Sequence, residues 1–195
     1  NMGLALAKRG DLDAAIDSYR RALKINPDYA DAFNNMGIAL AEKGDFDASI
    51  SSYNQALKID PGLLETHYNM GIALVEKGDL GAAIDSYSRA LKINPNYAEA
   101  HNNIGIALME KGDLDAAINS YQQALKIKVN YADCFMNLSS LKVQLSELSC
   151  KALDPNKNTS DVLYNTLSQN PKHQINQAIF NFLNGNLKRS GEYLK

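Results

Sequence analysis

The sequence lacks any apolar run that approaches the roughly 20 residues a transmembrane helix needs. It also lacks an excess of charge of either sign, because 20 basic and 22 acidic residues give a formal net charge of −2. The basic stripe that is typical of nucleic-acid binders is therefore missing. These absences favour an ordinary soluble protein that binds no nucleic acid and does not span a membrane.

Cysteine is scarce, with only Cys134 and Cys150 in the chain. The stretch that carries them has helical apolar spacing, and 16 residues along one helix correspond to about 24 Å. A disulfide requires Cα atoms at most about 7 Å apart, so we expect two free thiols and a reducing, cytoplasmic compartment. No secretory signal is visible. Asn1 enters the sequence pattern partway through a helix, however, so we expect a piece of a longer protein.

Catalytic and metal-binding motifs are missing as well. The sequence has no glycine-rich phosphate loop, no nucleophile elbow and no paired metal-ligand spacing. His67 and His101 share one repeat position, but packed repeats would separate them by about 10 Å, too far for one ion. We expect these histidines to pack or to hydrogen-bond, and we predict no enzymatic activity and no cofactor.

What the sequence does have is a repeat of 34 residues. Two glycine series keep this period: Gly3, Gly37, Gly71 and Gly105, and Gly10, Gly44, Gly78 and Gly112. A fixed period of about 20–50 residues is typical of stacked supersecondary units rather than of one globular core. The repeat predicts an array over residues 1–145. It comprises a partial unit (1–29), full units (30–63, 64–97 and 98–131) and a half unit (132–145).

Residues 30–63 show the plan of one unit. Apolar residues at helical spacing predict a first helix of about 13 residues. Gly44 can end that helix in a left-handed conformation, and Asp45 can cap the next one. The second helix ends before Pro61, because proline cannot continue a helix. Gly37 predicts a close approach of Tyr53, so each unit is expected to be a tight antiparallel helix pair.

This pattern resembles the tetratricopeptide repeat family over residues 1–145. The first full unit matches the family with Phe33, Met36, Gly37, Leu40, Ser49, Tyr53, Ala56 and Pro61. The next matches with His67, Met70, Gly71, Leu74, Ala83, Tyr87, Ala90 and Pro95, and the third with His101, Ile104, Gly105, Leu108, Ala117, Tyr121 and Ala124. In that third unit Val129 replaces the proline. The resemblance implies an all-α, right-handed superhelix whose first helices line a concave groove.

The pattern fades after Tyr131. Ser139 replaces the glycine and the Gly-Asp hinge is missing, so we expect one longer helix over about residues 131–152. We expect a loop at 154–158, a helix to about 169, and a last helix pair over 172–183 and 187–193. We interpret residues 146–195 as a helical cap whose last pair has the pattern of a degenerate repeat.

A series of asparagines provides the candidate binding site. Asparagine is a mediocre helix former, yet it recurs at one first-helix position, as Asn1, Asn35, Asn69, Asn103 and Asn137. Its amide both donates and accepts, and repeats spaced about 10 Å apart would meet every third residue of an extended peptide. The series resembles the asparagine ladder of O-linked N-acetylglucosamine transferases, which holds substrate backbone. Alternatively, each asparagine bonds a backbone group of the adjacent turn or repeat.

The other expected groove positions are polar, acidic or apolar. We predict that the peptide-binding residues are Asn34, Asn35, Ile38, Glu42, Tyr68, Asn69, Ile72, Glu76, Asn102, Asn103, Ile106, Glu110 and Asn137. The glutamates favour a neutral or basic extended segment. An acidic C-terminal tail is disfavoured, because Asn34 stands where the chaperone-tail-binding members of the family carry lysine. Alternatively, the carboxylates form a solvated face.

The sequence therefore predicts a protein–protein interaction scaffold that binds an extended peptide. Two alternatives stay open: a substrate-recruiting arm of a larger transferase whose catalytic domain lies outside this chain, and a structural scaffold that self-associates through the array ends. Each net hydrogen bond contributes about 0.5–1.5 kcal/mol, while association costs at least about 4 kcal/mol. We therefore expect weak and weakly sequence-selective binding.

Overall fold

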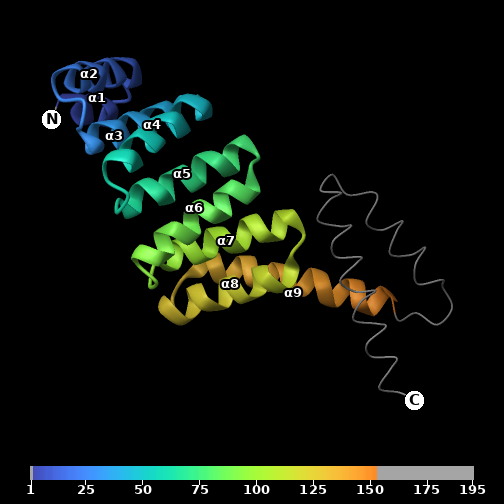
Figure 1. Cartoon of the computed structure of the whole chain (residues 1–195). Helices are drawn as coiled ribbons and strands as arrows, with labels where there is room; N and C mark the ends of the chain where they lie inside the picture. Colours follow the sequence, from blue (N-terminus) through green and yellow to red (C-terminus); the bar gives the residue numbers. More distant parts are fainter. Residues whose placement is uncertain (1, 153–195) are drawn as a thin grey trace. The chain divides into compact units, whose positions relative to one another are not determined.

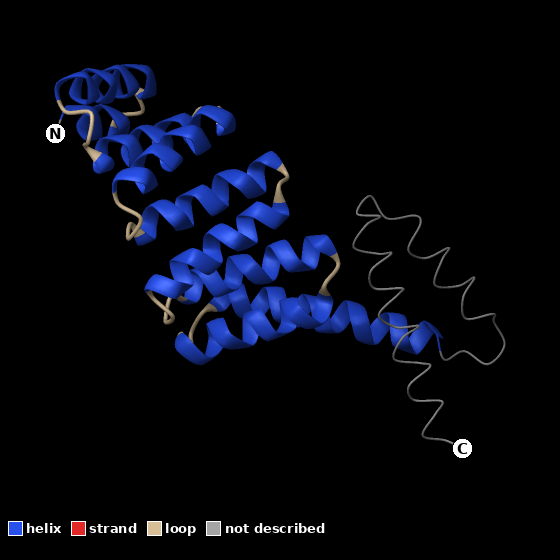
Figure 2. Cartoon of the chain, in the orientation of Figure 1, coloured by secondary structure: helices blue, strands red, loops and turns tan. Residues whose placement is uncertain are grey.

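The computed structural model describes residues 2–152, with side chains described up to residue 145. Over these residues it contains nine helices and no strand (Figures 1 and 2). The helices are α1 (Met2–Lys8), α2 (Leu12–Ile25), α3 (Ala30–Glu42), α4 (Phe46–Ile59), α5 (Leu64–Lys77), α6 (Leu80–Ile93), α7 (Ala98–Lys111), α8 (Leu114–Ile127) and α9 (Ala132–Ala152). The chain divides into two compact units, Asn1–Ala100 and His101–Lys195.

The hinge inside each helix pair has the expected conformation. Gly44 has a φ of +81°, in the left-handed region that glycine adopts without steric cost. The carboxylate of Asp45 then accepts a hydrogen bond of 3.2 Å from the backbone N–H of Ala48 and caps α4. The same pair of devices recurs in the other hinges, at Gly10 and Asp11, Gly78 and Asp79, and Gly112 and Asp113.

The two helices of a pair touch at a glycine, as the sequence predicts. A Cβ atom added to Gly37 would lie 2.6 Å from Cε1 of Tyr53, which is closer than any real contact. The hydroxyl of Ser49 donates to the Gly37 carbonyl oxygen at 2.7 Å and ties α4 to α3. Equivalent glycine–tyrosine contacts are Gly3 with Tyr19, Gly71 with Tyr87, and Gly105 with Tyr121. The pairs therefore close tightly because no side chain intervenes.

In the first unit each helix packs on the next one along the chain, from α1 to α6. The first helices α3 and α5 also contact each other, so they share a face of this unit. Fully buried alanines, such as Ala56 in α4 and Ala90 in α6, allow close packing between the helices. A side chain on the outer face of α3 therefore lies beside one on α5.

In the second unit α9 packs against α8 around Leu114, Tyr121 and Cys134. As expected, α9 runs without a hinge to Ala152. Cys134 is buried and free, and its Sγ donates to the carbonyl oxygen of Tyr121 at 3.4 Å. The expected boundary between the array and the cap, at residues 145 and 146, lies inside α9. The cap itself stays a prediction. The loop and helices expected after residue 152 lie outside the described residues.

Candidate peptide-binding surface

Four members of the asparagine series lie half-buried on the first helices of the pairs, and Asn1 lies outside the described residues. In the first unit Asn35 belongs to α3 and Asn69 to the neighbouring α5. In the second unit Asn103 belongs to α7 and Asn137 to α9. Each side chain thus keeps part of its surface accessible while its helix is held by the pair behind it.

A hydrogen-bond relay orients the first of these amides. The hydroxyl of Thr66, on α5, donates to Oδ1 of Asn34 at 2.9 Å. Nδ2 of Asn34 in turn donates to Oδ1 of Asn35 at 3.5 Å. The relay uses one lone pair of the Asn35 oxygen and leaves both N–H donors of its Nδ2 group for a ligand. The relay also links two consecutive repeats through side chains alone.

A related relay occurs in the second unit. Nδ2 of Asn137 donates to Oδ1 of Asn102 at 3.2 Å, and Nδ2 of Asn102 donates to Oδ1 of Asn103 at 3.3 Å. Asn102 is only 4% exposed and bonds both of its neighbours in the series. These hydrogen bonds join side chains of the same or the next repeat.

An aromatic group replaces the relay at Tyr68, which stands at the repeat position of Asn34 and Asn102. The Tyr68 ring lies 4.9 Å from that of Tyr97 and 5.7 Å from that of the buried Tyr87, in tilted orientations typical of aromatic pairs. Asn69 follows directly in α5, and its side-chain amide makes no hydrogen bond within the described part of the chain. This repeat therefore presents a side-chain amide without a hydrogen-bond partner beside an aromatic surface.

The predicted apolar and acidic positions also lie at the surface. Ile72 is 39% exposed, and Ile38 and Ile106 are half-buried. Glu42 and Glu76 are exposed and Glu110 is half-buried. No lysine or arginine of the described residues forms an ion pair with these glutamates. Each unit therefore has carboxylates that a basic ligand can pair with, as well as apolar surface.

His67 packs, as expected. His67 is 5% exposed, and its Nε2 donates to the carbonyl oxygen of Pro61 at 3.0 Å. Burial lowers the pKa of His67, and the positive charge of Arg89 adds to this effect against the opposing hydrogen bond to Pro61. Within residues 2–145, no cluster of three or more side chains could hold a metal ion. None of the described helices is long and apolar enough to span a membrane.

Sequence analysis missed two of the groups that shape this surface. Thr66, which starts the first relay, occupies the position of Ala32, Ala100 and Cys134 in the other repeats. Tyr97, which packs on Tyr68, precedes α7 in the loop. The departure of Thr66 from an otherwise apolar position was visible in the sequence and is the signal that could have identified it.

The geometry first defines a class, the all-α proteins built from 34-residue antiparallel helix pairs. A sequence profile described as TPR repeat matches residues 3–44, 39–78 and 73–112, and one described as tetratricopeptide repeat matches residues 98–131. These matches cover more than half of the chain. The chain belongs to the tetratricopeptide repeat family, which confirms both the resemblance and the expected fold class.

Solved structures with the same fold include three informative relatives. A MamA protein is 27% identical with a TM-score of 0.67, over 71% of this chain and 76% of that one. YrrB, described as a TPR protein with an unusual peptide-binding site, is 22% identical with a TM-score of 0.63, over 90% and 86%. A Thermobaculum terrenum O-GlcNAc transferase mutant is 28% identical with a TM-score of 0.58, over 64% and 24%. No curated protein sequence matches the chain.

Proposed function

We propose that this protein binds an extended peptide along the first helices of its repeats. As a tetratricopeptide repeat protein, the chain is a protein–protein interaction scaffold. The observation that supports a peptide ligand is the relay from Thr66 through Asn34 to Asn35. It holds an amide in one orientation at the surface, with N–H donors available for a peptide carbonyl oxygen.

The contacts within one unit suggest a weak interaction. The side-chain amides of Asn35 and Asn69 together contribute about 1–3 kcal/mol, since each net hydrogen bond contributes roughly 0.5–1.5 kcal/mol. Association costs at least about 4 kcal/mol, so apolar contacts must supply the difference. Ile38, Ile72 and Tyr68 offer that surface in the first unit. The unpaired Glu42 and Glu76 favour a neutral or basic peptide.

A titration of the full chain with short unstructured peptides of neutral, basic and acidic composition tests this function. The double variant Asn35→Ala with Asn69→Ala should weaken binding of the preferred peptide by about tenfold or more, because two hydrogen bonds are lost. Asn119→Ala is the matched control, since this asparagine is exposed on the second helix α8. Equal affinity of the double variant and the wild type would show that the asparagines are structural.

One observation favours a second function, a substrate-recruiting arm of a larger enzyme. The matched region of the Thermobaculum terrenum O-GlcNAc transferase makes up 24% of that chain. In this case the same surface would deliver a protein substrate to a catalytic domain. Sequencing the complete reading frame decides this point: an open reading frame without a transferase domain would exclude it.

The third alternative, self-association through the array ends, is tested by light scattering over a concentration series.

The expected compartment also stays a proposal. The tetratricopeptide repeat scaffold is typically non-catalytic. We propose that the chain has no enzymatic activity of its own and acts in the cytoplasm, where the free thiol of Cys134 would stay reduced. Imaging a fluorescent fusion of the complete reading frame tests the location, and accumulation outside the cytoplasm would contradict it.

A further inference from the structure

A cavity of about 380 Å³ lies in the first unit, where the second helices α4 and α6 adjoin the start of α5. Its lining consists of Leu57, Pro61, His67, Arg89, Lys92 and Ile93. A neighbouring cavity of about 640 Å³ shares Leu57 and Arg89. None of these residues belongs to the asparagine series, so the cavity is separate from the proposed peptide-binding surface.

The cavity contains cations that have no partner. Arg89 and Lys92 are three residues apart on α6 and therefore project from the same side of the helix. Both are exposed, and neither forms an ion pair in the described part of the chain. Leu57 and Ile93 supply apolar walls beside them. An anion with an apolar stem fits this combination of groups.

His67 adds a buried polar atom that has no partner. Its Nε2 donates to the carbonyl oxygen of Pro61, while Nδ1 is buried and makes no hydrogen bond with the described part of the chain. A buried polar atom without a partner is costly, so a ligand that supplies one gains affinity. Because burial lowers the pKa of His67, the ring is neutral at pH 7 and Nδ1 carries a lone pair.

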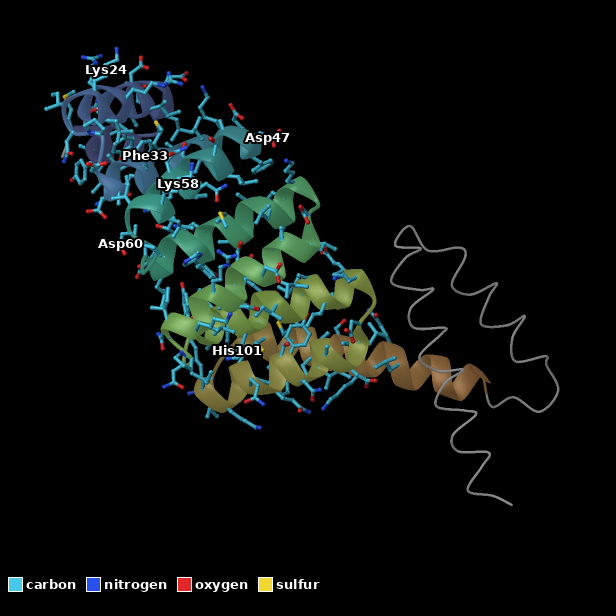
Figure 3. All side chains as sticks on the ribbon, viewed as in Figure 1. Lys24, Phe33, Asp47, Lys58, Asp60 and His101 are labelled. Atoms are coloured by element: carbon cyan, nitrogen blue, oxygen red, sulfur yellow. The ribbon has the colours of Figure 1, made fainter. Side chains whose placement is uncertain are left out.

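The charges around His67 are mostly positive. Arg89 and Lys92 of α6 line the cavity, and Lys58 and Asp60 stand at the C-terminal end of α4 (Figure 3). The Asp60 carboxylate already accepts a hydrogen bond of 2.8 Å from the backbone N–H of Gly62. Three cations against one carboxylate leave a net positive charge beside the cavity.

We propose that this cavity binds a carboxylate on an apolar stem, of the kind that a glutamate or aspartate side chain of a partner protein presents. Arg89 and Lys92 donate to the carboxylate oxygens. His67 takes up one proton from solvent at Nδ1, keeps its Nε2 bond to Pro61, and becomes a third donor. The bonds from Arg89 and Lys92 only slightly exceed the cost of association, and the cost of protonating His67 offsets the bond that it adds, so a single carboxylate binds in the millimolar range.

The repeat pattern makes this site unique among the repeats of the chain. The position of Arg89 holds Gln55 and Gln123 in the neighbouring repeats. The position of His67 holds Phe33 in the preceding repeat and His101 in the following one, where the arginine is absent. Only the repeat over residues 64–97 combines the histidine with the arginine. The other repeats therefore provide internal controls.

An NMR titration of the full chain, which has three histidines, tests the proposal. The probe is N-acetylglutamate methylamide, and its neutral isostere N-acetylglutamine methylamide is the matched control. The glutamate probe should raise the pKa of His67, because a nearby negative charge favours imidazolium, whereas the glutamine probe should not. Its affinity should fall as the pH rises through the His67 pKa, since binding takes up a proton.

Two substitutions separate this site from general surface attraction. Arg89→Gln, which introduces the residue of the neighbouring repeats, should weaken binding of the glutamate probe by about tenfold or more. Arg21→Gln, at the same position of the first repeat, should leave the affinity unchanged. Circular dichroism spectra establish that both variants are folded.

Several results would overturn the assignment. Equal binding of the glutamine probe, no binding of either probe, or an unchanged affinity in Arg89→Gln would each show that the cavity is not a carboxylate site. Inorganic phosphate provides a second arm of the titration. If it bound more tightly than the glutamate probe, the ligand class would be wrong and the site would be a phosphate site.

Discussion

Replacing a glycine inside a helix by alanine usually stabilises a protein, but the contact between Gly71 and Tyr87 predicts the opposite at position 71. A Cβ atom at position 71 would lie 2.5, 2.7 and 2.8 Å from Cε1, Cδ1 and Cζ of Tyr87. Carbon atoms in contact are normally about 3.5–4.0 Å apart, so the ring must move by roughly 1 Å. Tyr87 is 1% exposed and packs against Tyr68, which restricts that movement. We therefore expect Gly71→Ala to destabilise the protein.

The magnitude follows from two opposing terms. Replacing glycine by alanine inside a helix stabilises by about 0.5–1 kcal/mol, because the unfolded chain loses conformational freedom. Overpacking a well-filled core costs about 1–3 kcal/mol. At the middle of both ranges the net loss is about 1 kcal/mol, with an upper bound of about 2.5 kcal/mol. A loss of about 1 kcal/mol lowers the melting temperature of a chain of this length by about 2–4 °C.

The measurement is thermal unfolding of the full chain, followed by circular dichroism. Gly81→Ala is the matched control, because its Cβ would meet nothing closer than the Asp79 carboxylate at 3.8 Å. This variant should be as stable as the wild type or more stable, by up to about 1 kcal/mol. Adding Tyr87→Leu to Gly71→Ala should cost less than the sum of the single changes. A Gly71→Ala protein that melts at or above the wild-type temperature would refute the reasoning.

Three further predictions concern buried hydroxyl groups. Tyr121→Phe should stabilise the protein by about 1 kcal/mol, measured by urea unfolding, because the Tyr121 hydroxyl is buried without a hydrogen-bond partner among the described residues. A loss of stability would contradict this and would show that the hydroxyl is hydrogen-bonded. Thr66→Val should lower the stability by about 1 kcal/mol in the same assay, because Asn34 Oδ1 loses its donor. It should also weaken peptide binding, because Asn35 is no longer held in one orientation. Unchanged binding would show that the relay plays no part in peptide binding. Burial raises the pKa of Tyr53 from 10.0 to about 12, so the folded state favours the neutral phenol. Stability from this group is complete below pH 10 and is lost between pH 10 and 12, and Tyr53→Phe should make that loss shallower in urea titrations.

The parts of the structure that depend on one repeat could be predicted from the sequence. The hinge at Gly44, the capping Asp45 and the contact of Gly37 with Tyr53 are local, since each involves residues of a single helix pair. Ser139 agrees with this logic. It replaces the glycine where the matching tyrosine position holds Pro155, so the sequence offers no ring that requires a glycine opposite.

The contacts between repeats could not be predicted in the same way. Periodicity gives the face on which a residue lies, but not which neighbouring side chain fills the shared space. Asn34 and Asn102 occupy one repeat position, yet Asn34 receives its hydrogen bond from Thr66 and Asn102 from Asn137. The Arg89 cavity was missed for a related reason. It requires groups from α4, α5 and α6 together, and each of them looks like an ordinary surface or core residue in the sequence.

The hinge glycines have a consequence for how such a chain can change in length. At Gly10, Gly44 and Gly78 an added Cβ would meet nothing within 4 Å, so each of these turns is specified by its own backbone and by the aspartate that follows. A gene duplication that inserts one more 34-residue segment therefore brings a complete turn with it and requires no compensating change in its neighbours. The number of repeats is in this sense a freely adjustable quantity, and the reach of the binding surface can be altered without redesigning any single turn.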